Sequence, residues 1–332
     1  MKNPVRSTRQ LAEALGLSRW TVSRALNGHK GIHPDTIERI RQAARKSGFA
    51  PSALGRSLRS GKTELVGVCV PDLVDYFLSD KVMQLQKAIS ARGLDVLLQI
   101  SNGTPEGEQA ALERFAALHC QSVVVVAPCL APQAPAFRHL ENAGIPVVHI
   151  DSLTPGRGRQ VETDRKAGLQ RVAEHLHALG HRRLATVAIR PDSAYGRQRL
   201  EGLRLGARKG GASDASRIFH WPAPPETGTW AEFARHPVTA LVALNDRIAL
   251  RLLHWADREG LQVPRDLSIV GYDNAEIAAY SRPALTTVDP HASLLIEEAV
   301  RLLDHDKPTR VRVRPELVVR ESTGPAPKKK RK

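Results

Sequence analysis

A short helix predicted over residues 17–27 carries side chains suited to a polyanionic partner. Its outer face combines cationic, aromatic and hydroxyl groups with no carboxylate, on residues Arg19, Trp20, Ser23 and Arg24. A cationic face of this kind attracts phosphates. The alternative is an ordinary surface helix whose basic residues are only solvated.

The neighbouring sequence predicts a helix-turn-helix around this face. Ser18 stands where an N-cap belongs. An apolar stripe recurs at i, i+3 and i+4, on Val22, Ala25 and Leu26. Gly16 suits a tight turn after a first amphipathic helix over residues 8–15. Two short helices, a glycine turn and a basic second helix are typical of DNA-binding helix-turn-helix units.

A third helix and a linker complete the N-terminal segment. The helix is predicted to start after His33, which is a weaker N-cap than serine or threonine, and to end at Gly48. Residues 50–62 then form a linker with one or two turns of helix, in which Leu54 and Leu58 are spaced i, i+4. A helix this short needs a partner to order it.

The net charge of +15 is concentrated at the two ends of the chain. Residues 1–62 hold 13 Lys or Arg against 3 Asp or Glu, and residues 328–332 add five basic side chains. The remaining 265 residues carry no net charge. The polyanion-binding signal therefore belongs to the N-terminal segment and the tail.

From Leu65 onward, strands and helices alternate. Strands are predicted over 65–70, 95–100, 122–127, 146–150, 184–189, 218–220, 240–243 and 267–272. Helices are predicted over 79–92, 106–118, 134–143, 166–179, 199–209 and 246–259. Solid Val and Ile runs within such a pattern predict an α/β core of two doubly wound parallel-sheet lobes. Ligands of such sheets bind beyond the carboxyl ends of strands, here at Asp72, Asp151, Asn245 and Asp273.

Several other chemistries are not supported by the sequence. No apolar run is long enough for a membrane helix and no signal peptide begins the chain, so we expect an intracellular protein. Cys69, Cys120 and Cys129 are expected to be buried, inert thiols. The set His175, His177 and His181 is read as an ordinary helix end, so no metal or cofactor is expected. No catalytic spacing of nucleophile, base and acid is found.

Short sequence segments typical of one known family occur in that family's order along nearly the whole chain. They are Leu17-Ser18, Thr21-Val22-Ser23-Arg24 and Leu26-Asn27-Gly28; Arg56-Ser57-Leu58-Arg59; Val66-Gly67 through Pro71-Asp72; Glu174-His175-Leu176 and Leu179-Gly180-His181-Arg182-Arg183; Arg199-Leu200-Glu201-Gly202; Asn245-Asp246; Val263-Pro264 and Ser268 to Asn274; Pro283 with Leu285-Thr286-Thr287-Val288; and Glu316 to Ser322. Together they resemble the lac repressor/gal repressor family of bacterial transcription regulators.

The resemblance implies a domain organisation. It places a DNA-binding head at 1–49, a hinge at 50–62 and a periplasmic-binding-protein-like core at 63–324. The N-lobe would comprise about 63–160 and 290–312, and the C-lobe about 161–289 and 313–324, with crossovers near 161, 290 and 313. A basic tail, 325–332, resembles a nuclear import signal but is read as a solvated or added segment. The family also implies a homodimer on a palindromic DNA operator.

By the same analogy, the recognition helix would read bases with Arg19, Trp20 and Arg24. Arg24 offers the bidentate fork that suits guanine, whereas Trp20 would pack on thymine methyls or sugars, or else fold back into the head's core. The residues placed for phosphates are Ser18, Thr21, Ser23 and Asn27. The hinge residues placed for the minor groove are Leu54, Arg56, Leu58 and Arg59, with Leu58 as the wedge.

The resemblance also implies an effector site between the lobes. Its contact residues would be Asp273, Arg199, Asn245, Phe77, Asp151 and Trp221. The family's Asn-Pro-Phe-Phe region reads Asp75-Tyr76-Phe77-Leu78 here, so the stacking surface differs. A sugar or sugar derivative is the expected effector, with a nucleobase as the alternative.

We therefore expect a cytoplasmic, nucleoid-associated transcription regulator, most simply a repressor, whose operator affinity is set by a small molecule. It would not be an enzyme. The competing classes are a sugar-transport protein, a sugar-modifying enzyme and a non-specific architectural DNA binder. The first would need a signal peptide and no basic head, and the second would consume its sugar. The third would show little sequence preference.

Overall fold

The computed structural model describes residues 5, 7–26, 31–49, 63–73, 76–152, 158–209, 218–221 and 238–327, with the backbone alone at 76 and 77. The chain divides into two compact units, Met1–Glu64 and Leu65–Lys332. Within the described residues, no helix is both long and apolar enough to cross a membrane.

The first unit is a three-helix head. Its helices are α1 (Thr8–Leu15), α2 (Arg19–Leu26) and α3 (Pro34–Lys46). Gly16 between α1 and α2 has a φ of 64°, the left-handed conformation expected of the turn. Each helix contributes two buried side chains to a small core: Leu11, Ala12, Val22, Ala25, Ile40 and Ala44. The predicted helix-turn-helix is confirmed.

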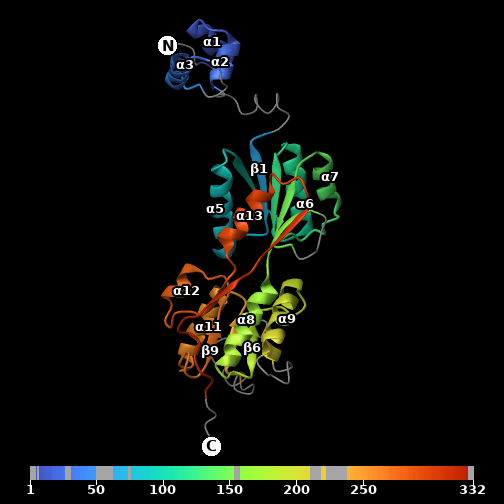
Figure 1. The fold of residues 1–332 in the computed structure, drawn as a ribbon, viewed down its shortest axis with the longest axis vertical. Coiled ribbons are helices and arrows are strands. Elements are labelled where there is room, and N and C mark those ends of the chain that lie inside the picture. Colours follow the sequence, from blue (N-terminus) through green and yellow to red (C-terminus); the bar gives the residue numbers. More distant parts are fainter. Residues whose placement is uncertain are drawn as a thin grey trace, which may run out of the picture. The chain divides into compact units, whose positions relative to one another are not determined.

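The second unit begins with a six-stranded parallel sheet in the order β11-β5-β4-β3-β1-β2. The strands are β1 (Leu65–Val70), β2 (Asp95–Ile100), β3 (Ser122–Val126), β4 (Val147–Ile150), β5 (Arg159–Thr163) and β11 (Thr309–Val313). The helices are α5 (Tyr76–Ser90), α6 (Pro105–Ala117), α7 (Pro135–Asn142) and α13 (Ala292–Leu302). α5 and α13 cover one face of this N-lobe sheet, and α6 and α7 cover the other (Figure 1).

The valine run of β3 explains why both faces are covered. Val124 and Val126 pack with α5 and α13, whereas Val123 and Val125 pack with α6 and α7. Successive side chains of a strand point to opposite faces. A strand that is apolar at every position therefore needs a helical layer on each side.

The C-lobe contains a four-stranded parallel sheet in the order β7-β6-β8-β9. Its strands are β6 (Leu184–Val187), β7 (Ile218–Trp221), β8 (Ala240–Ala243) and β9 (Ser268–Val270). The helices are α8 (Arg165–Ala178), α9 (Ala194–Lys209), α11 (Asp246–Arg258) and α12 (Glu276–Tyr280). α8 and α9 pack on one face of this sheet and α11 on the other. The predicted two-lobe α/β core is confirmed.

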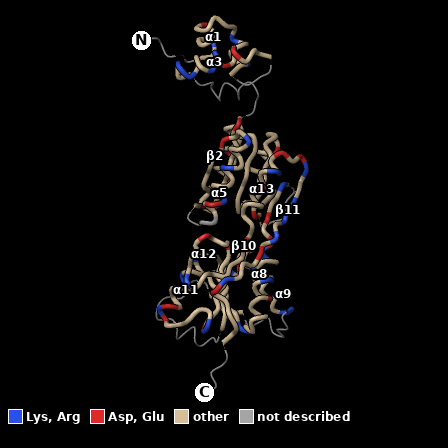
Figure 2. The backbone as a smooth tube through the Cα atoms, turned by 60° about the vertical axis from the view of Figure 1, so that its left-hand side comes forward, with Lys and Arg blue, Asp and Glu red and all other residues tan. Residues whose placement is uncertain are grey.

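Short segments join the lobes. The chain passes from β5 to α8, from β10 (Thr287–Asp289) to α13, and from β11 to β12 (Glu316–Val318). β10 and β12 pair antiparallel. The edge strand β11, labelled in Figure 2, carries Arg310 and Arg312. Both pair with the buried Glu162 of β5 at 2.7 Å, which anchors the edge strand.

The structure also departs from the sequence prediction. α5 begins at Tyr76 and α9 at Ala194, three and five residues before the predicted starts. Six elements were not predicted: β5, α12, β10, α13, β11 and β12. Cys129 is exposed rather than buried, because it follows β3 in a loop, whereas Cys69 and Cys120 are buried as expected. Burial raises the pKa of Cys69 to about 12 and that of Cys120 to about 11.

Gly202 should be essential to the contact between α8 and α9. A Cβ added at Gly202 would lie 2.3 Å from the Lys166 backbone oxygen, whereas one added at Gly158 would meet no atom within 4 Å. We expect Gly202→Ala to lower the free energy of unfolding by about 2 kcal/mol through overpacking. The matched Gly158→Ala should change it by less than about 1 kcal/mol. Urea unfolding of both variants checks this, and equal effects would contradict the packing argument.

Candidate DNA-reading helix and interlobe ligand site

The recognition helix α2 is fixed by its cap and its apolar stripe. The Thr21 backbone N–H donates to the Ser18 hydroxyl at 3.0 Å, and the Ser18 and Thr21 hydroxyls are 2.9 Å apart. Val22 and Ala25 are fully buried against the rest of the head. The opposite face of the helix is therefore held outward.

On that outward face, Trp20 is 63% exposed, so the alternative that it folds back into the core is wrong. The Arg24 guanidinium lies over the Trp20 ring, 4.8 Å from its centroid. Ser23 and Arg19 belong to the same helix. Asn27 and the four hinge residues Leu54, Arg56, Leu58 and Arg59 lie outside the described residues, and their predicted roles stay predictions.

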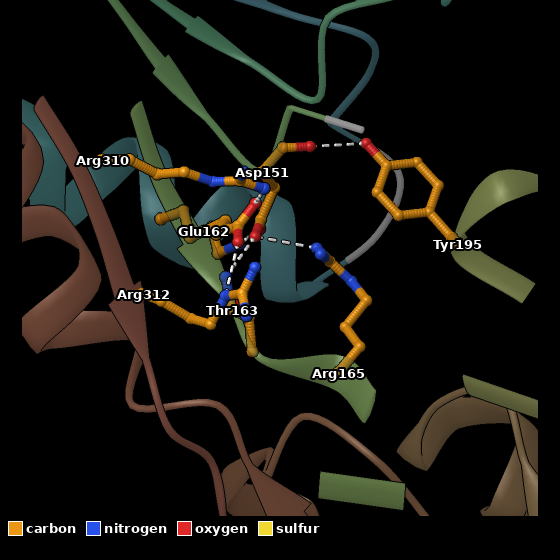
Figure 3. A network of polar contacts seen from close by, with 8 residues as sticks. Asp151, Glu162, Thr163, Arg165, Tyr195, Arg310 and Arg312 are labelled. Carbon is orange, nitrogen blue, oxygen red and sulfur yellow. Dashed lines mark hydrogen bonds and ion pairs between the residues drawn. The ribbon is translucent and has the colours of Figure 1, made fainter. Parts of the chain in front are cut away.

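The centre of the interlobe region is the buried carboxylate of Asp151, directly after β4. The Lys81 ammonium of α5 donates to Oδ2 at 2.8 Å. The Arg165 guanidinium of α8 lies 2.8 Å from Oδ1 (Figure 3). The Thr163 backbone N–H also donates to Oδ1, at 3.0 Å. One carboxylate thus joins an N-lobe helix to a C-lobe helix.

A tyrosine of α9 reinforces this junction. The Tyr195 hydroxyl donates to the Asp151 backbone carbonyl at 2.8 Å (Figure 3). The Arg165 guanidinium stacks over the Tyr195 ring, 4.7 Å from its centroid. Burial alone would raise the pKa of Asp151, but the charges of Arg165 and Lys81 together hold it well below its usual range.

The second polar centre lies where the C-lobe strands end. Arg199 of α9 donates from Nη1 to the Leu244 carbonyl at 2.7 Å and stacks on the Tyr272 ring, with 4.4 Å to the centroid. Arg199 is buried, yet its Nε has no hydrogen-bond partner among the described residues, and the buried Tyr272 hydroxyl has none there either. Burial lowers the pKa of Arg199 and raises that of Tyr272 to about 12.

Asn245 and Asp246, which follow β8, have different hydrogen-bond partners. Asn245, rather than Asp246, caps α11, since its Oδ1 accepts from the Ile248 backbone N–H at 3.0 Å. Asp246 instead accepts from the Thr287 hydroxyl at 2.5 Å and the Ala275 backbone N–H at 2.7 Å. Burial raises the pKa of Asp246 to about 6. The Asn245 oxygen is thus committed to the helix start.

Asp273 lines a cavity of about 640 Å³ formed by both lobes. Its walls come from α5, from the segment before and at the start of α12, from the end of β10 and from the start of α13. Five carboxylates line it: Asp80, Asp273, Glu276, Asp289 and Glu297. Asp273 has a φ of 104°, a conformation that costs energy in a residue with a side chain.

The predicted effector residues therefore form two neighbouring groups rather than one ring. Burial lowers the pKa of Arg199, and the charges of Asp273 and Asp151 act on it in the opposite direction. Asp273 alone of the predicted set lines the cavity. Trp221 ends the edge strand β7 half-buried, and the Phe77 side chain is outside the described residues.

Sequence reasoning missed four residues of this region. Lys81, Arg165 and Tyr195 meet Asp151 only through the fold, so no local pattern marks them. Tyr272 had a usable signal, because it stands directly before Asp273 at the end of a predicted strand. No group of three or more potential metal ligands occurs among the described residues.

A helix-turn-helix head joined to a core of two parallel-sheet lobes defines a ligand-controlled DNA-binding protein. Comparisons with known proteins agree. The model of bacterial regulatory proteins of the lacI family matches residues 9–52. The model of the periplasmic binding protein-like domain matches residues 173–323.

Similar proteins extend over the full length. The HTH-type transcriptional regulator AglR of Rhizobium meliloti is 30% identical, over 96% of this chain and 94% of that protein. The regulator CelR of Thermobifida fusca is 28% identical, over 97% and 100%. The chain belongs to the lacI family of bacterial regulatory proteins. It is a transcription regulator, and the family is one of regulators rather than enzymes.

Solved structures agree on the architecture. A CelR–cellobiose complex is 26% identical, over 95% of this chain and 99% of that chain, with a TM-score of 0.67. The lac repressor dimer bound to operator and the anti-inducer ONPF is 23% identical, over 97% and 100%, with a TM-score of 0.83. The second likeness shows the fold.

Asp151→Asn should destabilise the core strongly and change its pH dependence. Removing the charge leaves Lys81 and Arg165 buried without their counter-ion, at a cost of about 3–5 kcal/mol. Because the folded-state pKa of Asp151 is depressed, its contribution is present above about pH 4 and lost as the pH falls below it. Wild type should therefore lose more free energy of unfolding between pH 5 and pH 3 than the variant does.

Denaturant unfolding across that pH range measures the difference, with exposed Asp95→Asn as the control. The raised pKa of Asp246 affects the pH dependence of the free energy of unfolding with the opposite sign, but this contribution is the same in wild type and in both variants. Parallel pH profiles for wild type and Asp151→Asn would contradict the pairing.

Proposed function

We propose that this regulator is a repressor that binds a palindromic operator as a homodimer and changes its operator affinity when a carbohydrate occupies the interlobe site. The observation that carries the effector part is the buried pair Arg199 and Tyr272, whose Nε and hydroxyl have no partner. Buried polar groups are otherwise almost always hydrogen-bonded. Groups left in this way are suited to a ligand.

The chemistry of the two groups fits a polyol. Arg199 supplies a donor and Tyr272 a hydroxyl that donates or accepts, while Asp273 and the other cavity carboxylates accept from sugar hydroxyls. A similar regulator, CelR, has been solved with cellobiose. A carbohydrate is therefore favoured over a nucleobase, which would present fewer donors to so many carboxylates.

On the DNA side, we assign base contacts to Arg19 and Arg24 of the outward face of α2, on which Trp20 also stands, and phosphate contacts to Ser18, Thr21, Ser23 and Asn27. The exposed position of Trp20 and the capped, outward-facing geometry of α2 support this assignment. The head would comprise residues 1–49 and the hinge 50–62, with a core over 63–324 and a tail over 325–332. Action on an operator implies a cytoplasmic, nucleoid-associated protein.

Exposed apolar side chains support self-association of the core. Met83 on α5 is 63% exposed, and Ile277 and Tyr280 on α12 are 54% and 72% exposed. Large apolar groups in water favour burial against a partner. Sedimentation of the full chain would show a dimer under this proposal.

Control by the effector would be a population shift between lobe arrangements. Arg165 and Tyr195 of the C-lobe contact Asp151 of the N-lobe, so a ligand beside them changes the relative stability of those arrangements. The ligand can shift the equilibrium only by its difference in affinity for the two states.

Selection of operator sequences from random DNA, followed by binding of the selected operator with a carbohydrate panel, tests the function as a whole. One palindromic sequence should be enriched, and at least one sugar should change its affinity. A protein that binds all DNA alike would contradict the proposal, as would one that chemically converts the sugar.

Arg199→Lys and Tyr272→Phe should weaken the effector response while leaving operator affinity without effector unchanged. We expect at least tenfold weaker effector binding for Arg199→Lys, because lysine has no counterpart of the unpartnered Nε donor. Tyr272→Phe removes a buried hydroxyl that has no partner, so the unliganded core should be as stable as wild type or more so. Titration calorimetry and thermal unfolding measure both. Arg204→Lys, exposed on the same helix, is the control.

Leu58→Ala should weaken operator binding and reduce DNA bending, because a smaller side chain cannot unstack a base step. Gel-shift and bending assays on the selected operator measure this. The effector affinity of the variant should stay at the wild-type value. Unchanged binding and bending would contradict the hinge assignment.

A further inference from the structure

The recognition helix contains a paired aromatic and cationic side chain that the base-contact assignment leaves unexplained. Trp20 and Arg24 are four residues apart on α2, so their side chains lie on adjacent turns of one face. The guanidinium carbon of Arg24 lies 4.8 Å from the Trp20 ring centroid. Trp20 nevertheless remains 63% exposed. The indole ring therefore serves neither the head's core nor its cap.

Stacking leaves the donors of an arginine available. A guanidinium is planar, and its N–H groups point outward in that plane. The face of the group can rest on an indole while its edge donates to the O6 and N7 atoms of a guanine. The stack and the base contact therefore use different parts of Arg24 and do not compete.

Stacking also lowers the cost of holding Arg24 in one conformation. A long arginine side chain has substantial rotamer freedom, which an ordered base contact removes. A ring beneath the guanidinium restricts that freedom before DNA arrives. α2 contains no acidic residue that could orient Arg24 from within the helix instead.

We propose that Trp20 is a positioning residue, a platform that orients Arg24 for a guanine in each operator half-site, rather than a base reader itself. This inference rests on the proposed role of Arg24 as a base reader. It changes the expected consequence of a substitution at residue 20, because the preference that is lost belongs to the guanine read by Arg24.

The test compares the full chain and its variants on the selected operator and on the same operator carrying 7-deazaguanine, which lacks the N7 acceptor. Arg24→Ala should lower the preference for guanine over adenine at one position by about 5- to 150-fold. Trp20→Leu should lower affinity for the unmodified operator by about two- to fivefold, and further if DNA excludes water from the stack. On the 7-deazaguanine operator the effect of Trp20→Leu should fall below twofold.

Two backgrounds make the coupling specific. In Arg24→Ala, Trp20→Leu should have less than a twofold effect, because no guanidinium remains to orient. Arg19→Ala removes a cation of the same helix but leaves the stack of Trp20 and Arg24 in place. In that background Trp20→Leu should keep its full effect on operator affinity. Thermal unfolding and the affinity for non-specific DNA check that the head of each variant stays folded. Because the Trp20 indole is exposed, its replacement should leave the head folded.

The outcomes distinguish failure of the base-reading role of Arg24 from failure of the platform role of Trp20. Guanine preference retained in Arg24→Ala overturns the base-reading role and the platform with it. Preference lost in Arg24→Ala, with an equal effect of Trp20→Leu in both backgrounds and on both operators, overturns the platform alone and makes Trp20 a direct DNA contact. No effect of Trp20→Leu on the unmodified operator also overturns the platform alone.

Discussion

The core depends on a single buried carboxylate shared by cations from both lobes. Asp151 is bound by Lys81 at 2.8 Å from the N-lobe and by Arg165 at 2.8 Å from the C-lobe. Charges removed from water are tolerated only when they are paired and hydrogen-bonded. Any motion that separates the lobes must therefore break or replace this pair. The junction gives the core a defined arrangement whose alternatives cost free energy, which is the requirement for a two-state response to a ligand.

Beside this satisfied centre lies an unsatisfied one. Arg199 and Tyr272 stack on each other with one donor and one hydroxyl left without partners, although both are buried. The two centres lie within electrostatic reach, since Arg165 and Asp151 both act on Arg199. A ligand bound at Arg199, as proposed, would lie close to the Asp151 junction. Under the proposed function, this proximity would link effector occupancy to the relative position of the lobes without a long chain of intermediate residues.

Local sequence rules predicted the parts of the fold that local interactions determine. The valine strand over 122–126 and the cap at Ser18 are read from neighbours in sequence. The crossover strands were missed, because β10 and β12 are three residues long and pair across a separation that no local pattern encodes. At the Asp151 site, the sequence predicted the carboxylate but not its cationic partners, for the same reason. A residue after a strand is recognisable, but its partner Lys81 lies 70 residues away.

The stack of Trp20 and Arg24 is an interaction between neighbours in sequence, so a substitution can change it without affecting distant segments. It needs only two positions one helical turn apart, whereas the Asp151 junction needs three segments in register. A substitution at residue 20 leaves Val22 and Ala25 buried and the head's core intact. If α2 reads the operator as proposed, operator preference can therefore change at its exposed face without disturbing the buried charges of the Asp151 junction. The Asp151 junction that holds the core and the stack on the proposed DNA-reading helix are separable, because the junction is long-range in sequence and the stack is local.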